Sequence, residues 1–499
     1  MNEISTAFPE FGFPQSDVSG GGSTTVINPA TGAPVVELGL ASLAETDAAI
    51  ERAHRAFGPW RGMAPGERAR LLRAFASAVE AHQGELAQLE VVGSGHTIGN
   101  ALWEAGNVRD VLNYYSASPE RHVGKQIPVA GGVDITFHEP LGVVGIIVPW
   151  NFPMPIAGWG FAPALAAGNT VVLKPAELTP LTAMRIAELA LEAGIPEGVF
   201  TVLPGKGSVV GQRFVTHPLV RKVCFTGSTE VGKGIMRGCA DQVKRLTLEL
   251  GGKSANIVFD DADLEAAAAS APGGAFDNAG QDCCARSRIL VQQNAYERFL
   301  ELLEPAVKAF RATNPSSPDA QMGPLISAKQ RDAVAVYIDA ADVAYAGTVD
   351  YGAGAAGSAG PGSAGVAGAG AAGAGASSDG FWLPPTVVLP ADVADPVWRE
   401  EMFGPVVAVM PFTDEADAIA KANDTEYGLS GSIFTRDLGR ALRVARGIET
   451  GNLSINSHSS VRYWTPFGGF KQSGLGRELG PDAPDSFSEV KNVFISTET

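Results

Sequence analysis

Cysteine is scarce in this sequence. Four cysteines occur in 499 residues, and their spacing matches neither a disulfide framework nor the paired ligands of a zinc site. Secreted disulfide scaffolds and structural zinc sites both need such spaced pairs. The sequence therefore predicts a reducing, cytoplasmic location and no bound metal.

Positive charge is also in short supply. The chain carries 37 lysines and arginines against 54 aspartates and glutamates, which gives a formal net charge of −17 at pH 7. Basic surfaces are what bind nucleic acids and anionic membranes, so neither is expected as a partner. An anionic cofactor stays compatible with this charge, because helix N-termini and glycine loops hold phosphate groups locally.

Apolar runs long enough to span a membrane are absent. Val143–Val148 is apolar throughout but has the length of a buried strand. The first ten residues contain neither a basic region nor an apolar core, so no signal peptide is expected.

The usual Gly-x-Gly-x-x-Gly dinucleotide fingerprint is missing as well. Gly205, Gly207 and Gly211 resemble it, but they follow Pro204 in a loop and are weak evidence by themselves. Any dinucleotide site must therefore be recognised from other motifs.

One segment lacks every kind of apolar periodicity. In residues 352–376, ten glycines and eleven alanines fill 21 of 25 positions. This composition buries too little surface to offset chain entropy, so a loosely ordered surface insertion is expected. A binding loop is the alternative.

The rest of the chain alternates short apolar runs with helical patterns, and its length predicts two or three domains. Such alternation indicates βαβ units and open α/β sheets. A first group of expected strands is Val143–Pro149, Thr170–Leu173, Phe200–Leu203 and Val223–Phe225, and a second is Ala255–Phe259, Ser287–Val291 and Val406–Met410. Helical spacing marks Leu43–Gly58, Gly66–Val92, Trp103–Ser118, Pro180–Ala193 and Val209–Thr216.

The strongest chemical signal is the stretch from Phe276 to Ser287, which contains the adjacent Cys283 and Cys284. Gly280 and Gln281 provide small, polar surroundings, which we expect to favour the reactive thiolate. Glu249 lies 34 residues before Cys283 and is followed by two glycines. A thiol nucleophile with a carboxylate base can form and hydrolyse a thioester. The alternative for Cys283 is an inert buried thiol.

Three further motifs follow expected strands. Asn151 lies between two prolines after the first strand, Lys174 and Glu177 follow the second, and Gly227 with Ser228 opens a helix. Ligands of open α/β sheets bind at the carboxyl ends of the strands, where all three motifs fall. Each could alone be a turn or a surface charge, but together they predict a dinucleotide site.

These motifs together resemble the aldehyde dehydrogenase superfamily from about Asn28 to the end of the chain. Later motifs agree: Glu400–Pro405, Tyr427–Ser430 and Pro466–Gly474. The resemblance implies an α/β fold with a Rossmann-like NAD-binding domain (1–120 and 142–252), an α/β catalytic domain (253–481) and a small β oligomerisation element (121–141 and 482–499). It also implies a homodimer or homotetramer.

The resemblance assigns roles by position. Cys283 would attack the aldehyde, Asn151 would stabilise the oxyanion, and Glu249 would activate water to hydrolyse the thioester. Positions implied to bind the cofactor are Ile147, Val148, Pro149, Trp150, Lys174, Glu177, Gly207, Gly211, Phe225, Gly227, Ser228, Val231, Leu250, Glu401 and Phe403. Positions implied to line the aldehyde tunnel are Phe152, Ile156, Trp159, Asp282, Cys284, Val461 and Phe467.

The expected cofactor is NAD, because the Glu177 carboxylate would accept from ribose hydroxyls and repel a 2′-phosphate. Lys174 softens this preference, so NADP use stays possible. Aromatic tunnel positions and Asp282 predict an uncharged or amine-bearing aldehyde. Arg462 would instead suit a semialdehyde with a carboxylate.

Two alternative functions remain, together with one departure from the sequence pattern of the family. A relative that transfers the acyl group to CoA commonly lacks the base, and a non-catalytic NAD-binding scaffold would be expected to lose Cys283 or Glu249. Both residues are present, which favours hydrolysis. Many relatives carry a lysine after the pocket tryptophan, whereas Gly160 follows Trp159 here, so the proton exit route is open although Glu478 is present.

Overall fold

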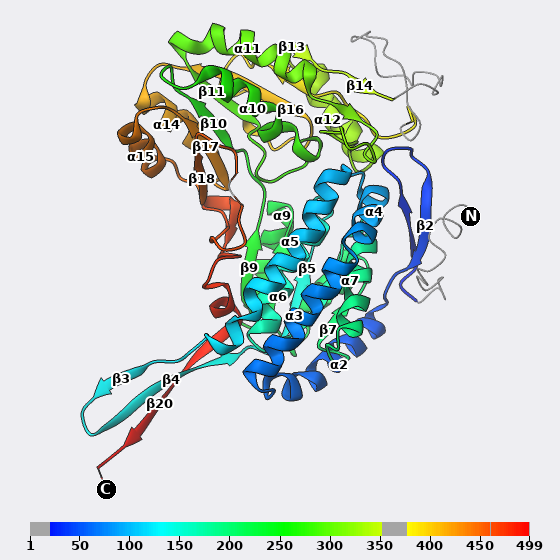
Figure 1. The fold of residues 1–499 in the computed structure, drawn as a ribbon, viewed down its shortest axis with the longest axis vertical. Coiled ribbons are helices and arrows are strands. Elements are labelled where there is room, and N and C mark those ends of the chain that lie inside the picture. Colours follow the sequence, from blue (N-terminus) through cyan, green and yellow to red (C-terminus); the bar gives the residue numbers. More distant parts are fainter. Residues whose placement is uncertain (1–19, 352–376, 460, 499) are drawn as a thin grey trace.

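The computed structural model describes residues 20–351, 377–459 and 461–498. The chain forms two α/β lobes and a long β-hairpin that projects from the lower lobe (Figure 1). The Gly/Ala-rich segment 352–376 lies outside the described residues, as does most of the N-terminal arm. Among the described residues, no helix combines the length and the apolar character that a membrane crossing requires.

The lower lobe is built on a six-stranded sheet in the order β19-β9-β8-β5-β6-β7. The strands β5 to β9 are parallel to one another, and β19 pairs antiparallel with β9. The strands are β5 (Val143–Ile147), β6 (Thr170–Lys174), β7 (Phe200–Val202), β8 (Val220–Thr226), β9 (Arg245–Glu249) and β19 (Gly474–Leu475). The strand order reverses between β5 and β8, which is the arrangement of a Rossmann-like sheet.

Helices connect these strands and cover the sheet (Figure 1). They are α6 (Pro153–Ala166), α7 (Leu181–Glu192), α8 (Gln212–Thr216) and α9 (Thr229–Ala240). The sequence prediction treated the two prolines that flank Asn151, Pro149 and Pro153, as part of a loop, but Pro153 occupies the first turn of α6. Proline is tolerated there because its missing N–H would have no helical partner.

Four N-terminal helices pack against this lobe: α2 (Leu43–Arg61), α3 (Pro65–Ala81), α4 (Gln83–Ser94) and α5 (Ile98–Ser116). The expected helical span Gly66–Val92 is two helices that meet at His82. Thr97 caps α5 through its side chain, so this helix begins earlier than the predicted Trp103.

The upper lobe contains a seven-stranded sheet in the order β13-β15-β16-β11-β10-β17-β18. Its strands are β10 (Ala255–Val258), β11 (Arg288–Gln292), β13 (Val343–Ala346), β15 (Thr386–Val388), β16 (Val406–Phe412), β17 (Ser430–Phe434) and β18 (Asn452–Ile455). Its helices are α10 (Leu264–Phe276), α11 (Tyr296–Ala309), α12 (Ala328–Ala340), α13 (Pro396–Arg399), α14 (Glu415–Asn423) and α15 (Leu438–Gly447). The three strands predicted in this lobe are all present, with ends that differ by one or two residues.

Three small sheets complete the described chain. The projecting sheet pairs β3 (Gln126–Val129), β4 (Gly132–Pro140) and β20 (Ser488–Ser496) in antiparallel register. The other two pair β1 (Ser23–Ile27) with β2 (Pro34–Gly39), and β12 (Ala312–Thr313) with β14 (Val349–Asp350). The final strand and the segment 121–141 therefore form one β element.

Candidate active site

A pocket of 230 Å³ opens at the carboxyl ends of β5, β8 and β9, where the strand order reverses. Open α/β sheets bind their ligands at this position. Residues from both lobes line it: Pro149, Trp150, Asn151, Thr226, Gly227, Ser228, Glu249, Leu250, Gly251, Cys283, Glu401 and Phe403. The structure thus brings all three expected catalytic residues to one cavity.

Cys283 follows a left-handed backbone turn that links α10 to the pocket. Asn278, Ala279 and Gly280 all have positive φ angles, of 49°, 55° and 70°. A Cβ atom on Gly280 would also lie 2.1 Å from the carbonyl oxygen of Gly404. Glycine is required at position 280 both by the positive φ angle and by the close approach of the loop that contains Gly404.

Gln281 anchors this turn, and its amide does not act on the sulfur. Its Nε2 donates to the Asn278 carbonyl at 3.0 Å, and its Oε1 accepts from the Ile326 backbone N–H at 2.9 Å. The sequence prediction placed this amide beside Cys283 as part of a polar environment. The structure shows instead a buried side chain that fixes the loop.

Asn151 lies at the end of the segment that follows β5 and is 4% exposed. Its Nδ2 donates to the Gln281 carbonyl at 3.1 Å, and its own carbonyl accepts from Asn278 Nδ2 at 2.7 Å. A primary amide carries two N–H groups, so one remains available for a ligand at Cys283. The side chain and the backbone carbonyl of Asn151 are therefore both hydrogen-bonded to the turn that precedes Cys283.

Glu249 ends β9 and is 2% exposed, with no hydrogen-bond partner for its Oε1. Burial, then the nearby Cys284 and Glu478, raise the pKa of Glu249 well above its usual range, while a hydrogen bond with Cys283 opposes this rise. A carboxyl group with a raised pKa is a stronger proton acceptor once ionised. This environment suits a general base.

The surroundings of Cys283 do not favour the thiolate, which corrects the sequence prediction. Its contact with Cys284, then burial and the Glu249 carboxylate, raise the pKa of the Cys283 thiol well above its usual range. Negative groups nearby and the loss of water both disfavour an anionic sulfur. Cys283 therefore rests as a thiol and needs a proton acceptor, and Glu249 is within hydrogen-bonding reach.

Two glycines let the upper lobe close on this centre. A Cβ on Gly251 would lie 2.3 Å from Glu401 Oε2, and one on Gly252 would lie 2.2 Å from the Cys283 carbonyl oxygen. The Gly252 N–H donates to Glu401 Oε1 at 2.9 Å. Glu401 and Phe403 consequently face the pocket, and the Phe403 ring meets Trp150 edge-on at 5.3 Å.

Seven of the fifteen expected cofactor positions line the same cavity: Pro149, Trp150, Gly227, Ser228, Leu250, Glu401 and Phe403. Gly227 has a φ of 157°, and Ser228 precedes α9 without a capping bond from its side chain. The N-terminus of α9 thus presents free backbone N–H groups, which attract phosphate. Ile147, Val148, Phe225 and Leu250 are buried at the strand ends, whereas Val231 is 51% exposed on α9.

The motif after β6 lies further along the same edge. Glu177 Oε1 accepts from the Gly207 backbone N–H at 3.2 Å, so these two expected positions are in contact. Lys174 is 4% exposed, and its Nζ donates to the carbonyls of Pro175 and Gly205. Burial lowers the pKa of Lys174 to about 8. Gly211 is buried at the end of the same turn, next to Ile147.

The expected substrate positions pack as one group beside Cys283. Trp159, Phe467, Ile156 and Cys284 are buried, and Phe152 and Val461 are partly exposed next to them. The Trp159 and Phe467 rings lie 5.4 Å apart, and Trp159 Nε1 donates to Asn107 Oδ1 at 2.9 Å.

Two aromatic residues that the sequence analysis missed extend this group. The Tyr114 and Tyr463 rings are 5.5 Å apart, and both pack on the same cluster while partly exposed. Tyr114 comes from α5, far from the recognised motifs, so spacing gave no signal for it. Tyr463 adjoins the expected Val461 and could have been included.

The two charged candidates behave differently. Asp282 Oδ1 accepts from the Cys284 backbone N–H at 2.9 Å, so its carboxylate is turned toward its own loop. Arg462 is exposed, and its nearest partner is the Ser459 carbonyl at 3.5 Å. Neither side chain projects a free charge onto the aromatic group.

Glu478 and Lys222 form a second buried polar pair next to the centre. Glu478 is 7% exposed, and Lys222 is 2% exposed. Burial raises the pKa of Glu478 to about 7, although Lys222 opposes the shift. Lys222 Nζ also donates to Thr247 Oγ1 at 2.8 Å and to the Ser486 carbonyl at 2.9 Å. Since residue 160 is glycine, Lys222 is the buried cation near Glu478.

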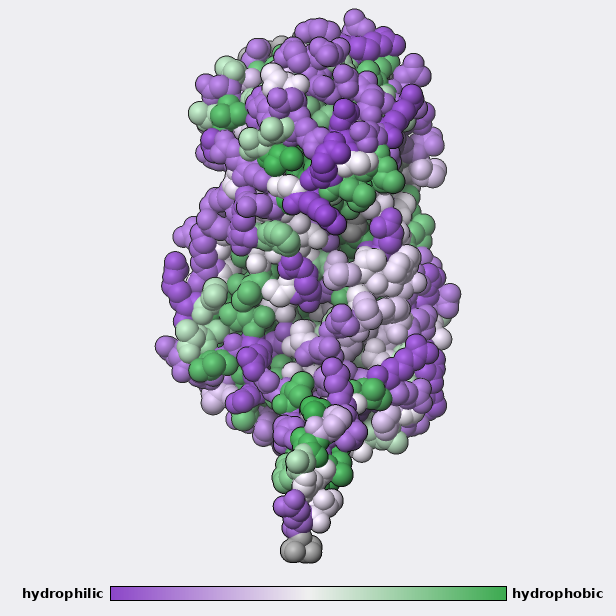
Figure 2. Space-filling view, turned by 90° about the vertical axis from the view of Figure 1, so that its left-hand side faces the viewer, coloured by the Kyte–Doolittle hydropathy of each residue, from purple (hydrophilic) through white to green (hydrophobic). Residues whose placement is uncertain are grey.

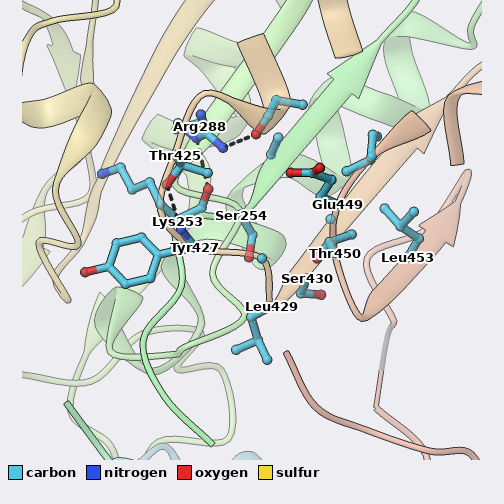
Figure 3. Close-up of a pocket in the computed structure, with 15 residues that line it drawn as sticks. Lys253, Ser254, Arg288, Thr425, Tyr427, Leu429, Ser430, Glu449, Thr450 and Leu453 are labelled. Carbon is cyan, nitrogen blue, oxygen red and sulfur yellow. Dashed lines mark hydrogen bonds between the residues drawn. The ribbon is translucent and has the colours of Figure 1, made fainter. Parts of the chain in front are cut away.

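A smaller polar pocket lies behind Lys253, in the upper lobe (Figure 3). Its volume is only 20 Å³, enough for about one water molecule. Arg288 crosses beside it and donates to the carbonyls of Lys253, Lys421 and Ala422. This region fixes the segment after Glu249 and offers no room for a substrate.

The sequence and the fold were compared with those of known proteins. The sequence model of the Aldehyde dehydrogenase family matches residues 17–493. The chain belongs to this family. It is 38% identical over 477 residues to the putative aldehyde dehydrogenase DhaS of Bacillus subtilis, covering 94% of this chain and 92% of that protein. It is 40% identical to a betaine aldehyde dehydrogenase of Cereibacter sphaeroides, covering 95% and 94%.

Solved structures agree with the sequence match. A betaine aldehyde dehydrogenase of Staphylococcus aureus in complex with NAD+ superposes with a TM-score of 0.88 at 35% identity, covering 96% of this chain and 92% of that one. PnpE in complex with nicotinamide adenine dinucleotide gives a TM-score of 0.89 at 39% identity, covering 96% of each chain. The resemblance, the fold class and the aldehyde dehydrogenase activity expected from the sequence are confirmed.

Proposed function

We propose that this aldehyde dehydrogenase oxidises an aldehyde to its carboxylic acid with NAD, using Cys283 as nucleophile, Asn151 as oxyanion donor and Glu249 as base. The observation that carries this proposal is their convergence, from three separate segments, on one pocket at the reversal point of the sheet. Retention of both Cys283 and Glu249 argues against a non-catalytic scaffold and against acyl transfer to CoA.

The pocket fits a dinucleotide. The N-terminus of α9 behind Gly227 and Ser228 suits the pyrophosphate, and Glu177 suits the adenosine ribose hydroxyls. Glu401 lines the pocket from the upper lobe and suits the second ribose. When bound there, the nicotinamide supplies the acceptor for the hydride that leaves the aldehyde carbon. NADP use remains compatible with Lys174 beside the ribose site.

The protein's own residues supply the remaining chemistry. Cys283 Sγ bonds to the aldehyde carbon while its proton passes toward Glu249, and the free Asn151 N–H stabilises the resulting oxyanion. A thioester on Cys283 remains after oxidation. After Glu249 has passed on the proton taken from Cys283, its carboxylate removes a proton from water and the new C–O bond forms. The C–S bond then breaks, the Cys283 sulfur takes a proton back from Glu249, and the acid leaves.

Every turnover leaves protons at the buried Glu249 that must reach solvent. Glu478 interacts electrostatically with Glu249, and Lys222 interacts with Glu478. A pKa of about 7 lets Glu478 both accept and release a proton near neutral pH. We propose that Glu478 and Lys222 carry these protons outward in place of a lysine at position 160.

The substrate that we propose is an uncharged aromatic or aliphatic aldehyde, or one that bears an amine. The wall beside Cys283 consists of aromatic faces, and these attract both apolar groups and ammonium ions. At its outer end Asp482 interacts electrostatically with Tyr114, which adds negative potential. Arg462 is exposed, which disfavours the alternative of a semialdehyde with a carboxylate.

A panel of aldehydes assayed with NAD tests this proposal. An ω-amino aldehyde, a benzyl-type aldehyde and succinic semialdehyde are compared at one pH, with NADH and acid product measured together. We expect one acid per NADH and the highest kcat/KM for the first or second compound. A semialdehyde that wins by about tenfold, or about 1.4 kcal/mol in transition-state preference, contradicts the substrate assignment. NADH formation without acid contradicts the reaction itself.

We also propose that the projecting sheet joins subunits into a dimer or tetramer. Its exposed apolar side chains include Phe137, Phe494 and Ile495, at 44%, 52% and 50% exposure. Figure 2 shows hydrophobic side chains along this narrow projection at the foot of the molecule. The four cysteines are free, which fits the reducing cytoplasmic location that we propose.

A further inference from the structure

Four titratable side chains, Glu90, His96, Glu104 and Asp277, gather behind Asn151, and the proposed chemistry uses none of them. The first three are buried and Asp277 is partly exposed. His96 is 3% exposed, Glu90 is 2% exposed and Glu104 is fully buried. Burying such groups is costly unless they are paired. These groups lie next to Asn151, the proposed oxyanion donor.

Their contacts centre on the His96 ring. Its Nδ1 shares a hydrogen bond with Glu104 Oε1, and Glu90 Oε1 lies 3.8 Å from the same nitrogen. Glu90 is itself held by Thr182 Oγ1 at 2.9 Å. Nδ1 and Glu104 are already in direct contact, so no ion fits between them. The arrangement is therefore a proton-sharing pair rather than a metal site.

The His96 ring also reaches the catalytic segment. The His96 ring lies close enough to the backbone carbonyl of Asn151 to interact with it, and the Phe152 ring lies 5.6 Å away at an angle of 60°. Asn278 Nδ2 donates to the same Asn151 carbonyl at 2.7 Å. The peptide group that follows the Asn151 side chain is thus held by Asn278 and faced by His96.

One protonation pattern satisfies these contacts. Burial lowers the pKa of His96, and burial together with Asp277 raises the pKa of Glu104 well above its usual range. A neutral imidazole has a single N–H. If the shared proton resides on Glu104, Nδ1 accepts it, and Nε2–H is left to donate to the Asn151 carbonyl.

We propose that His96, oriented by Glu104, is a positioning residue that fixes the Asn151 peptide so that the side-chain amide meets the oxyanion. The proposal rests on the role of Asn151 stated above. It assigns a task to a buried pair that lies outside the pocket and touches neither substrate nor cofactor. Misplacing a catalytic group by about 1 Å costs roughly 100-fold in rate, so a positioning residue has a measurable effect.

The test compares His96→Phe, which keeps a ring against Phe152 but removes both nitrogens, with His96→Gln, which keeps an amide donor. We expect the rate of the first NADH burst to fall roughly 10- to 100-fold in His96→Phe, with KM for aldehyde and NAD within about threefold. His96→Gln should recover most of the rate. Glu104→Gln should stay within about twofold, because its amide N–H replaces the proton of the neutral acid. The buried His217, remote from this group, serves as control, and His217→Phe should leave the burst rate unchanged.

A double-mutant cycle separates positioning from general structural damage. If His96 acts through Asn151, His96→Phe adds no further loss to Asn151→Ala. Losses that multiply, an unchanged burst in His96→Phe, or a large loss in Glu104→Gln each overturn the proposal. Should Asn151→Ala itself keep the wild-type rate, the assigned role of Asn151 fails, which is a different result. If His96→Phe does not fold, His96→Leu in both backgrounds completes the cycle, because leucine also removes both ring nitrogens.

Discussion

At the scale of single residues, the centre is defined by what burial does to charge. At Glu249 and Glu478 burial raises the pKa, and at the Cys283 thiol the contact with Cys284 raises it together with burial. Each therefore rests in its neutral form more readily than in water. We infer that catalysis in this protein passes protons among these groups and does not start from a preformed thiolate.

Glu478→Gln tests the energetic side of this account. The pKa of Glu478 is raised from 4.5 to about 7, so between these values the native state binds more protons than the unfolded state. The contribution of Glu478 to the free energy of unfolding is therefore present in full at low pH and is lost as the pH rises through about 7. The variant removes this loss, worth about 3 kcal/mol at most.

We expect the apparent Tm of Glu478→Gln to exceed that of the wild type at about pH 8 and to match it at about pH 5. Thermal scans of both proteins across this range check the prediction, with the exposed Glu426→Gln as control. A Tm difference that does not grow with pH removes Glu478 from the proton-transfer account.

The residues that sequence reasoning found are those with a chemical signature. Cys283, Glu249 and Asn151 could be proposed because their types and neighbours suit the reaction, and the structure brings them to one cavity. His96, Tyr114 and the anchoring role of Gln281 could not, because each acts through a contact between segments distant in sequence. The thiolate prediction for Cys283 was wrong because local composition does not report burial or the approach of Glu249.

At the scale of elements, apolar runs fixed by period and length predicted the central strands well. β5 and β6 are buried at every position, as expected for the middle of a parallel sheet. Helices were harder to delimit. α6 was missed because Pro153, Pro155 and Pro163 argue against a helix unless the first is known to lie in its opening turn.

The projecting sheet gives an element-scale prediction. Phe137 and Ile495 lie on one face of β4 and β20 and are both exposed. Apolar side chains exposed on such an element indicate a subunit contact. Replacing both with serine should yield monomers by light scattering while the far-ultraviolet spectrum stays unchanged.

Val336→Ser is the matched control, because Val336 is 66% exposed on α12, in the other lobe. We expect this variant to keep the wild-type mass. Equal mass for the Phe137/Ile495 variant and the wild type would rule out this face as the contact between subunits.

At the scale of the whole molecule, the two lobes are brought together at the pocket by close backbone contacts. Gly252 passes against the Cys283 carbonyl, and Gly251 passes against the Glu401 side chain. The nucleophile and Glu401 thus come from the upper lobe, while Asn151 and Glu249 come from the lower one. We therefore expect the reaction to require both lobes in this relative position.

The most direct measurement of the central claim is the fate of the acyl group in Glu249→Gln. This variant keeps Cys283 and the cofactor pocket but cannot activate water. We expect one NADH per active site in a single burst, which is slower than the first turnover of the wild type because Cys283 has also lost its proton acceptor. A stall follows, and intact mass spectrometry should show the protein heavier by the acyl group of the aldehyde. Cys283→Ala, as control, should show neither burst nor added mass. Normal steady-state turnover by Glu249→Gln, or an adduct that persists in Cys283→Ala, would contradict the assignment of these two residues.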